Sequence, residues 1–75
     1  MRYSNLLAEL KRANLKPITV AEAIGVSLPA YYSRLNGRTK FKLSDMRAIQ
    51  KLLNEKLNED LSLDYLFTNS YDKDN

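Results

Sequence analysis

The side chains of this sequence that could do chemistry are mainly basic, and they gather in its first part. Residues 1–42 hold eight basic and two acidic side chains, a net charge of +6, whereas residues 43–75 hold four basic and seven acidic ones, a net charge of −3. Lysine and arginine bind nucleic acid by displacing the counterions that condense on its phosphates. This uneven distribution favours one face that meets a polyanion, and an ordinary solvated surface is the alternative.

Other kinds of chemistry lack the residues they need. The sequence contains no histidine and no cysteine, and its two glycines are too far apart to form a phosphate-binding loop. The acidic pairs Glu55/Glu59 and Asp72/Asp74 do not have the spacing of a metal site. We therefore expect no enzymatic activity, no cofactor and no bound metal.

Length and hydropathy define the class of protein. The chain has 75 residues, of which 44% are hydrophobic, and this suffices for one small domain with a modest core. The sequence has neither an N-terminal apolar run nor an apolar stretch of about 18 residues. These features predict a cytoplasmic protein without a signal peptide and without a role in a membrane.

Apolar residues recur three and four positions apart, which predicts an all-helical chain. The first helix would have Ser4 or Asn5 as its cap and would end at Leu15. A further helix would open at Ser44 after an extended linker over 40–43, and Ser62 would cap a last short turn. The apolar stripes of these three elements are Leu6, Leu7, Leu10 and Ala13, then Met46, Ile49, Leu52, Leu53 and Leu57, and finally Leu63, Leu66 and Phe67.

Between them, prolines at the first turn and glycines at the end mark two short helices, over about 17–24 and 28–36. They are joined by Gly25-Val26-Ser27, which supplies a glycine able to take positive φ, an apolar plug and an N-cap. Ala21 is the small residue that lets two such helices cross closely. The pattern predicts a helix-turn-helix over about 17–36, and an ordinary helical hairpin is the alternative.

Several segments in fixed order extend this pattern over nearly the whole chain, from about Leu6 to Phe67. They are a leucine-rich first helix, Val20-Ala21-x-x-Ile24-Gly25-Val26-Ser27, Tyr31-Tyr32-x-x-Leu35-Asn36-Gly37, Phe41-x-Leu43-Ser44-Asp45 with Ile49, and Ser62 to Phe67. In this order the chain resembles the Cro/repressor (XRE-type) helix-turn-helix family, in the small free-standing form of phage and prophage control regions. The resemblance implies an all-α, compact five-helix bundle of the lambda-repressor-like type over 1–67, with a flexible polar tail over 68–75.

The resemblance also implies which residues would meet DNA, because in such domains the third helix faces base edges and flanking groups hold phosphates. The candidates are the forward-facing Leu28, Pro29, Tyr32 and Ser33, the cap Ser27, the backbone clamps Asn36, Arg38 and Lys40, and Lys16 at the entry of the second helix. The stem of Arg34 is expected to pack while its head reaches toward the DNA backbone.

Departures from the family pattern leave two functions open. Leu28-Pro29-Ala30 stands where the family has Arg, Gln, Asn or Ser, so these positions cannot form bidentate contacts to bases. The first function is a transcriptional regulator that binds two-fold operator DNA as a homodimer. The alternative is an antirepressor, a modulator of repression, which binds a phage repressor protein through this apolar helix end. Four residues of the C-terminal part could either form dimer contacts or pack in the core: Leu61, Leu63, Tyr65 and Phe67.

Overall fold

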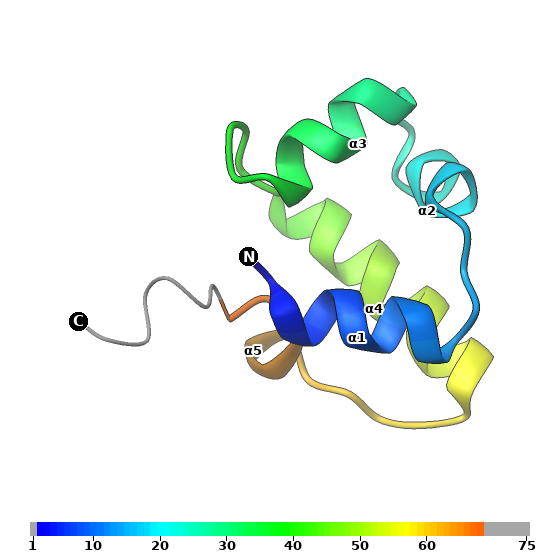
Figure 1. The fold of residues 1–75 in the computed structure, drawn as a ribbon. Helices are drawn as coiled ribbons and strands as arrows, with labels where there is room; N and C mark the ends of the chain where they lie inside the picture. The colour runs from blue at the N-terminus through cyan, green and yellow to red at the C-terminus, as the bar shows by residue number, and fades with distance from the viewer. Residues whose placement is uncertain (1, 69–75) are drawn as a thin grey trace.

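The computed structural model describes residues 2–68, and these form five helices and no strand (Figure 1). The helices are α1 (Ser4–Arg12), α2 (Pro17–Ile24), α3 (Leu28–Leu35), α4 (Leu43–Leu57) and α5 (Leu63–Leu66). The expected all-α bundle of five helices is therefore confirmed. In this part of the chain, no helix combines the length and the apolar character needed to cross a membrane. The predicted tail falls on residues 68–75, of which all but Thr68 lie outside the described residues.

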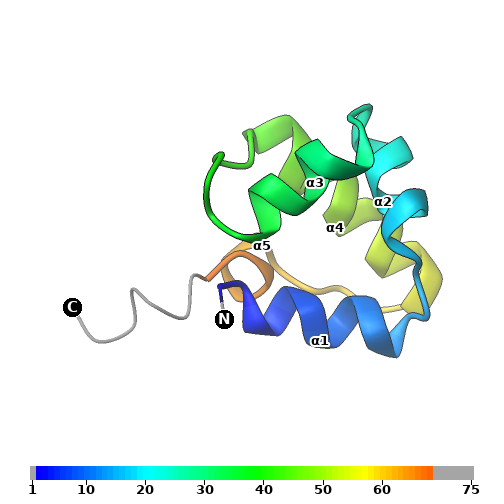
Figure 2. The same cartoon turned by 45° about the horizontal axis from the view of Figure 1, so that its top comes forward.

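The helices are arranged around α4 (Figures 1 and 2). Helix α2 packs against α4 and against α3, and α1 packs against α5, which also contacts α4. In both views α3 lies on one side of α4 and α1 on the other. As a result, α3 has an outer face that no other described helix covers.

Apolar residues from all five helices form the core. Leu6, Val20, Ala21, Ile49, Leu53 and Leu66 are fully buried, and Tyr31 is 2% exposed. A second group of rings packs beside them, because Phe41 contacts Tyr3 and Phe67 edge to face with centroid distances of 5.4 and 5.3 Å. The apolar stripes predicted from the sequence are buried or half-buried, as expected. Leu61 and Phe67 are half-buried and pack against this core, Leu63 is half-buried, and Tyr65 is 39% exposed.

The ends of three helices, α1, α4 and α3, differ from the sequence prediction. Helix α1 has Tyr3 as its N-cap, in the left-handed region with a φ of 53°, so neither Ser4 nor Asn5 caps it. The helix ends at Arg12 rather than near Leu15. Helix α4 begins at Leu43, a position expected in the linker, because the Asp45 carboxylate accepts the backbone N–H of Lys42 at 3.1 Å.

Helix α3 ends one residue earlier than the expected 28–36, because Asn36 is its C-cap. Gly37 follows with a φ of 81° and takes the backbone out of the helix. The last turn is as predicted, since the Ser62 hydroxyl accepts the Tyr65 N–H at 3.1 Å.

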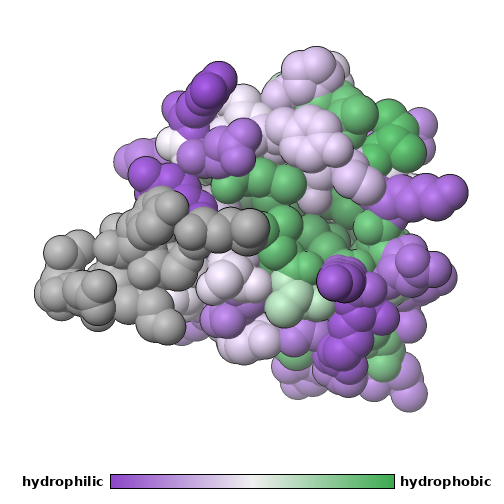
Figure 3. All heavy atoms as spheres, viewed as in Figure 1, coloured by the Kyte–Doolittle hydropathy of each residue, from purple (hydrophilic) through white to green (hydrophobic). Residues whose placement is uncertain are grey.

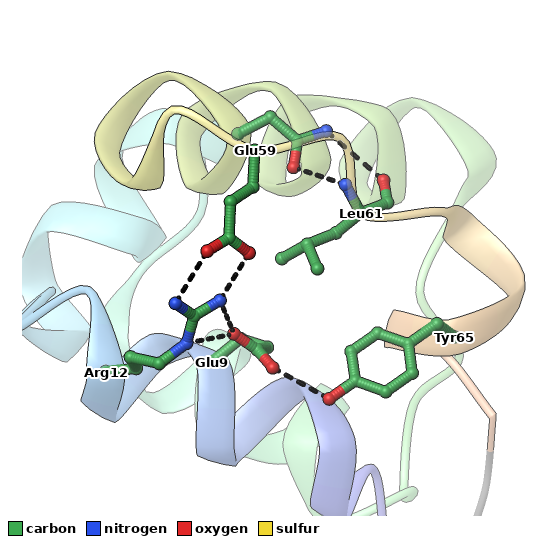
Figure 4. Close-up of polar contacts among 6 residues, drawn as sticks. Glu9, Arg12, Glu59, Leu61 and Tyr65 are labelled. Carbon is green, nitrogen blue, oxygen red and sulfur yellow. Dashed lines mark hydrogen bonds and ion pairs between the residues drawn. The ribbon is translucent and has the colours of Figure 1, made fainter.

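A polar clasp of Glu9, Arg12, Glu59 and Tyr65 ties α1 to the end of α4 and to α5 (Figure 4). The buried Glu9 carboxylate accepts hydrogen bonds from the Tyr65 hydroxyl at 2.7 Å and from the Arg12 Nε at 2.8 Å. Arg12 also donates to both carboxylate oxygens of Glu59. The bond to Glu9 raises the pKa of Tyr65, and the bonds from Arg12 lower the pKa of Glu59.

Candidate nucleic-acid interface

The connection between α2 and α3 has the geometry that its residues predict. Gly25 has a φ of 73°, and a Cβ there would meet no atom within 4 Å, so conformation rather than space calls for glycine. The Val26 N–H then donates to the Ala21 carbonyl at 3.0 Å. The predicted cap at Ser27 is confirmed, because its hydroxyl accepts the Ala30 N–H at 3.3 Å. This turn fixes where the first turn of α3 lies.

The outer face of α3 carries the candidates spaced by three, four and seven residues. Pro29, Tyr32 and Asn36 are exposed, Ser33 is half-buried, and positions with this spacing share one helix face. Leu28 differs from the expectation of a forward-facing residue, because it is half-buried and packs against the core. The apolar end of α3 therefore consists mainly of Pro29 and of the Tyr32 ring, which is 44% exposed.

The inner face of α3 anchors this surface. Tyr31 is 2% exposed, and burial, assisted by the neighbouring Tyr32, raises the pKa of Tyr31 to about 12. The two rings contact each other with centroids 5.8 Å apart, so the buried ring helps to hold the exposed one. The Ser33 hydroxyl lies 3.0 Å from the Thr39 hydroxyl, which joins the helix to the loop that follows it.

Exposed cations stand at both ends of this face. Lys16 is at the N-cap position of α2, and Arg38 and Lys40 lie on the loop after α3. Figures 1 and 2 both show α2 near one end of α3 and this loop at the other. The structure thus places the basic candidates on either side of the helix rather than in one cluster.

Arg2 is a functional candidate that the sequence analysis did not single out. Its side chain lies over Gly37, where a Cβ would come within 2.1 Å of the Arg2 Nε. Arg2, Gly37 and Lys40 also line one hollow together with the aromatic residues Tyr3 and Phe41. No local sequence pattern indicates the contact between Arg2 and Gly37, because 35 positions separate the two residues. The only sequence signal that involves Arg2 is the excess of basic residues in 1–42.

The expectation that the Arg34 head reaches outward was wrong. Its side chain is 13% exposed, with its Nε 3.4 Å from the Asp45 carboxylate of α4. One of its terminal nitrogens donates to the Ala30 carbonyl at 3.1 Å, while the buried Nε has no hydrogen-bond partner. The guanidinium therefore links α3 to the start of α4 and is withheld from the outer face.

Apolar surface occurs beyond α3 as well. Figure 3 shows apolar side chains gathered in the middle of one face, between α3 and α1, with charged residues toward the rim. On α2, Ile18 is 48% exposed. Residues 2–68 contain no group of three or more acidic side chains that could hold a metal ion.

Comparisons of this chain with protein-family models, with curated proteins and with solved structures found no match.

Proposed function

We propose that this chain is a helix-turn-helix transcriptional regulator of the phage genetic-switch type, which binds operator DNA through α3. The observation that carries the proposal is the outer face of α3, which is uncovered and has exposed cations beyond both of its ends. A helix of eight residues is about 12 Å long, and the major groove of B-DNA is wide enough to admit an α-helix.

The charges suit the two walls of that groove. With α3 in the groove, Lys16 at the start of α2 approaches one phosphate backbone, and Arg38 with Lys40 approaches the other. Phosphate contacts of this kind orient the helix and supply affinity, whereas base contacts from α3 supply preference.

The proposal includes a homodimer on a two-fold operator, with half-sites about one helical turn apart. Two-fold operators let each protomer place an identical helix in successive major grooves on one side of the duplex. The cellular location that goes with this function is the cytoplasm.

The test is fluorescence anisotropy of the protein with DNA from its own upstream region and with scrambled DNA, each at several salt concentrations. We expect a preference for the native DNA and a steep salt dependence. Arg38→Ala should weaken binding to both DNAs and reduce the salt slope by about one, because one phosphate contact is lost. Lys56→Ala is the matched control, since Lys56 is an exposed lysine at the far end of α4.

Variants of the helix face complete this test. Tyr32→Ala and Ser33→Ala should change which sequences are preferred, because these residues lie on the outer face of α3. Affinity that does not depend on salt, or an Arg38→Ala variant that behaves like Lys56→Ala, would contradict the proposal.

The second candidate function is binding to a partner repressor protein. The apolar surface between α3 and α1 favours this function (Figure 3). A protein of this kind binds DNA weakly and without preference, and instead forms a tight complex that alters the DNA binding of the repressor. Pull-down against a repressor encoded nearby tests this function. Pro29→Asp should weaken capture if the outer face of α3 is used, because it places a charge at an exposed apolar position.

A further inference from the structure

The outer face of α3 lacks the side chains that read guanine. Arginine or lysine paired with guanine is the commonest specific contact in the major groove. Helix α3 contains one arginine and no lysine, and the Arg34 guanidinium is directed toward Asp45, with its Nε 3.4 Å from that carboxylate. A turn of this side chain to the outer face would leave the Asp45 carboxylate, whose side chain is 10% exposed, without its ion-pair partner.

Polar readout from the rest of this helix is limited as well. Helix α3 contains no glutamine or asparagine, and asparagine occurs only at its C-cap, as Asn36. The Ser33 hydroxyl already has the Thr39 hydroxyl as a partner at 3.0 Å. The Tyr32 hydroxyl and the Ser33 hydroxyl, which already contacts Thr39, are therefore the polar groups that the outer face of the helix itself offers.

The same face does offer apolar surface at its N-terminal half. Pro29 is exposed, and the Tyr32 ring, three residues later on the same side, is 44% exposed and packs against the buried Tyr31 ring. The 5-methyl group of thymine is the apolar group that base pairs present in the major groove. Lys16, Arg38 and Lys40, beyond the two ends of the helix, are exposed cations, and such charges complement the phosphates of a duplex better than an apolar protein segment.

We propose that Pro29 and Tyr32 determine specificity by contacting thymine methyl groups, so that the half-site under the start of α3 is marked by thymines rather than by guanines. This inference rests on the proposed function and deepens it. Preference arises because a methyl group is removed from water against the proline and tyrosine rings, whereas cytosine in the same place leaves those rings without an apolar partner.

The experiment separates the methyl group from every other feature of the base. Selection from duplexes with about 20 random base pairs, two helical turns, identifies the best-bound sequence. Each thymine of that sequence is then replaced singly by deoxyuridine, which removes the methyl and keeps the hydrogen-bonding pattern. We expect one or two positions in each half-site to lose about fourfold in affinity, the effect of exposing one buried methyl.

Protein variants assign the effect to residues. With Tyr32→Ala or Pro29→Ala, affinity should fall and the difference between thymine and deoxyuridine should disappear at one of these positions. Lys56→Ala should retain both the affinity and the difference. Both substituted residues are exposed, and far-ultraviolet circular dichroism checks the fold of each variant. The measurement on the unaltered protein decides the matter by itself if a variant does not fold.

The failures of the two proposals are distinguishable. Tight, selective binding with equal affinity for thymine and deoxyuridine at every position overturns the methyl inference and leaves the proposed function standing. A selected site with guanines rather than thymines under α3 would likewise overturn the methyl inference and leave the proposed function standing. Failure to bind any duplex better than bulk DNA overturns both.

Discussion

Replacing Arg34 by methionine should destabilise the protein about as much as replacing Arg34 and Asp45 together. The two side chains are 13% and 10% exposed, and the Arg34 Nε lies 3.4 Å from the Asp45 carboxylate. Methionine keeps most of the arginine stem in place but leaves the Asp45 charge buried without its partner. Asp45→Asn is destabilising for the converse reason, because it leaves the Arg34 guanidinium unpaired while retaining an oxygen that can accept the Lys42 N–H.

The expected size follows from the geometry. At 3.4 Å and an effective dielectric constant of about 20, the attraction between the charges is about 5 kcal/mol before the cost of removing them from water. Desolvation offsets more than half of this, and the Arg34 Nε has no hydrogen bond to recover it. We therefore expect each single variant to lose about 2 kcal/mol of unfolding free energy and the double variant to lose about the same.

The assay is urea unfolding at neutral pH, followed by far-ultraviolet circular dichroism, for the four proteins of the double-mutant cycle. Equal dependence of the unfolding free energy on urea concentration across the four shows that the unfolded states are comparable. Losses that add within about 0.5 kcal/mol would refute the reasoning, since they mean that the two charges do not interact in the folded protein.

Two further predictions concern the turn and the buried ring. Gly25→Ala should lower the unfolding free energy by about 1–2 kcal/mol, because residue 25 has a φ of 73° that alanine disfavours. Gly25→Asn should lower it less, since asparagine tolerates the left-handed region better. Equal losses of the two variants in thermal unfolding would contradict a conformational cause. Burial raises the pKa of Tyr31 from 10.0 to about 12, so its stabilising contribution is complete below pH 10 and is lost as pH rises toward 12. Tyr31→Phe should therefore show a smaller alkaline loss of thermal stability, whereas an unchanged loss would assign the alkaline transition to other groups.

The parts of the fold that could be predicted from the sequence depend on residues close together in the chain. Gly25 and Ser27 act within one turn, and the Ile49 and Leu53 positions follow the helical repeat, so their roles can be inferred locally. The start of α4 also had a local sign, because Asp45 stands three residues after Lys42 and accepts its N–H.

What could not be predicted depends on contacts between distant segments. Tyr3, the N-cap of α1, has a left-handed backbone conformation, and its ring packs on Phe41 and Phe67. No local sequence pattern indicates either feature. Within the candidate site, the direction of Arg34 depends on Asp45 of the next helix, and the position of Arg2 depends on Gly37. The composition of the outer face was predictable from helical spacing, whereas the half-burial of Leu28 required the packed structure.

The polar clasp also has a consequence for how the protein is made. Glu9 and Tyr65 are separated by 56 positions, so at about 5–20 residues per second the ribosome adds the second about 3 to 11 seconds after the first. Leu66, which is fully buried, is synthesised one step later still. During that interval α1 lacks α5, the helix against which it packs in the finished domain. Folding of this domain is therefore completed only after synthesis has passed Leu66.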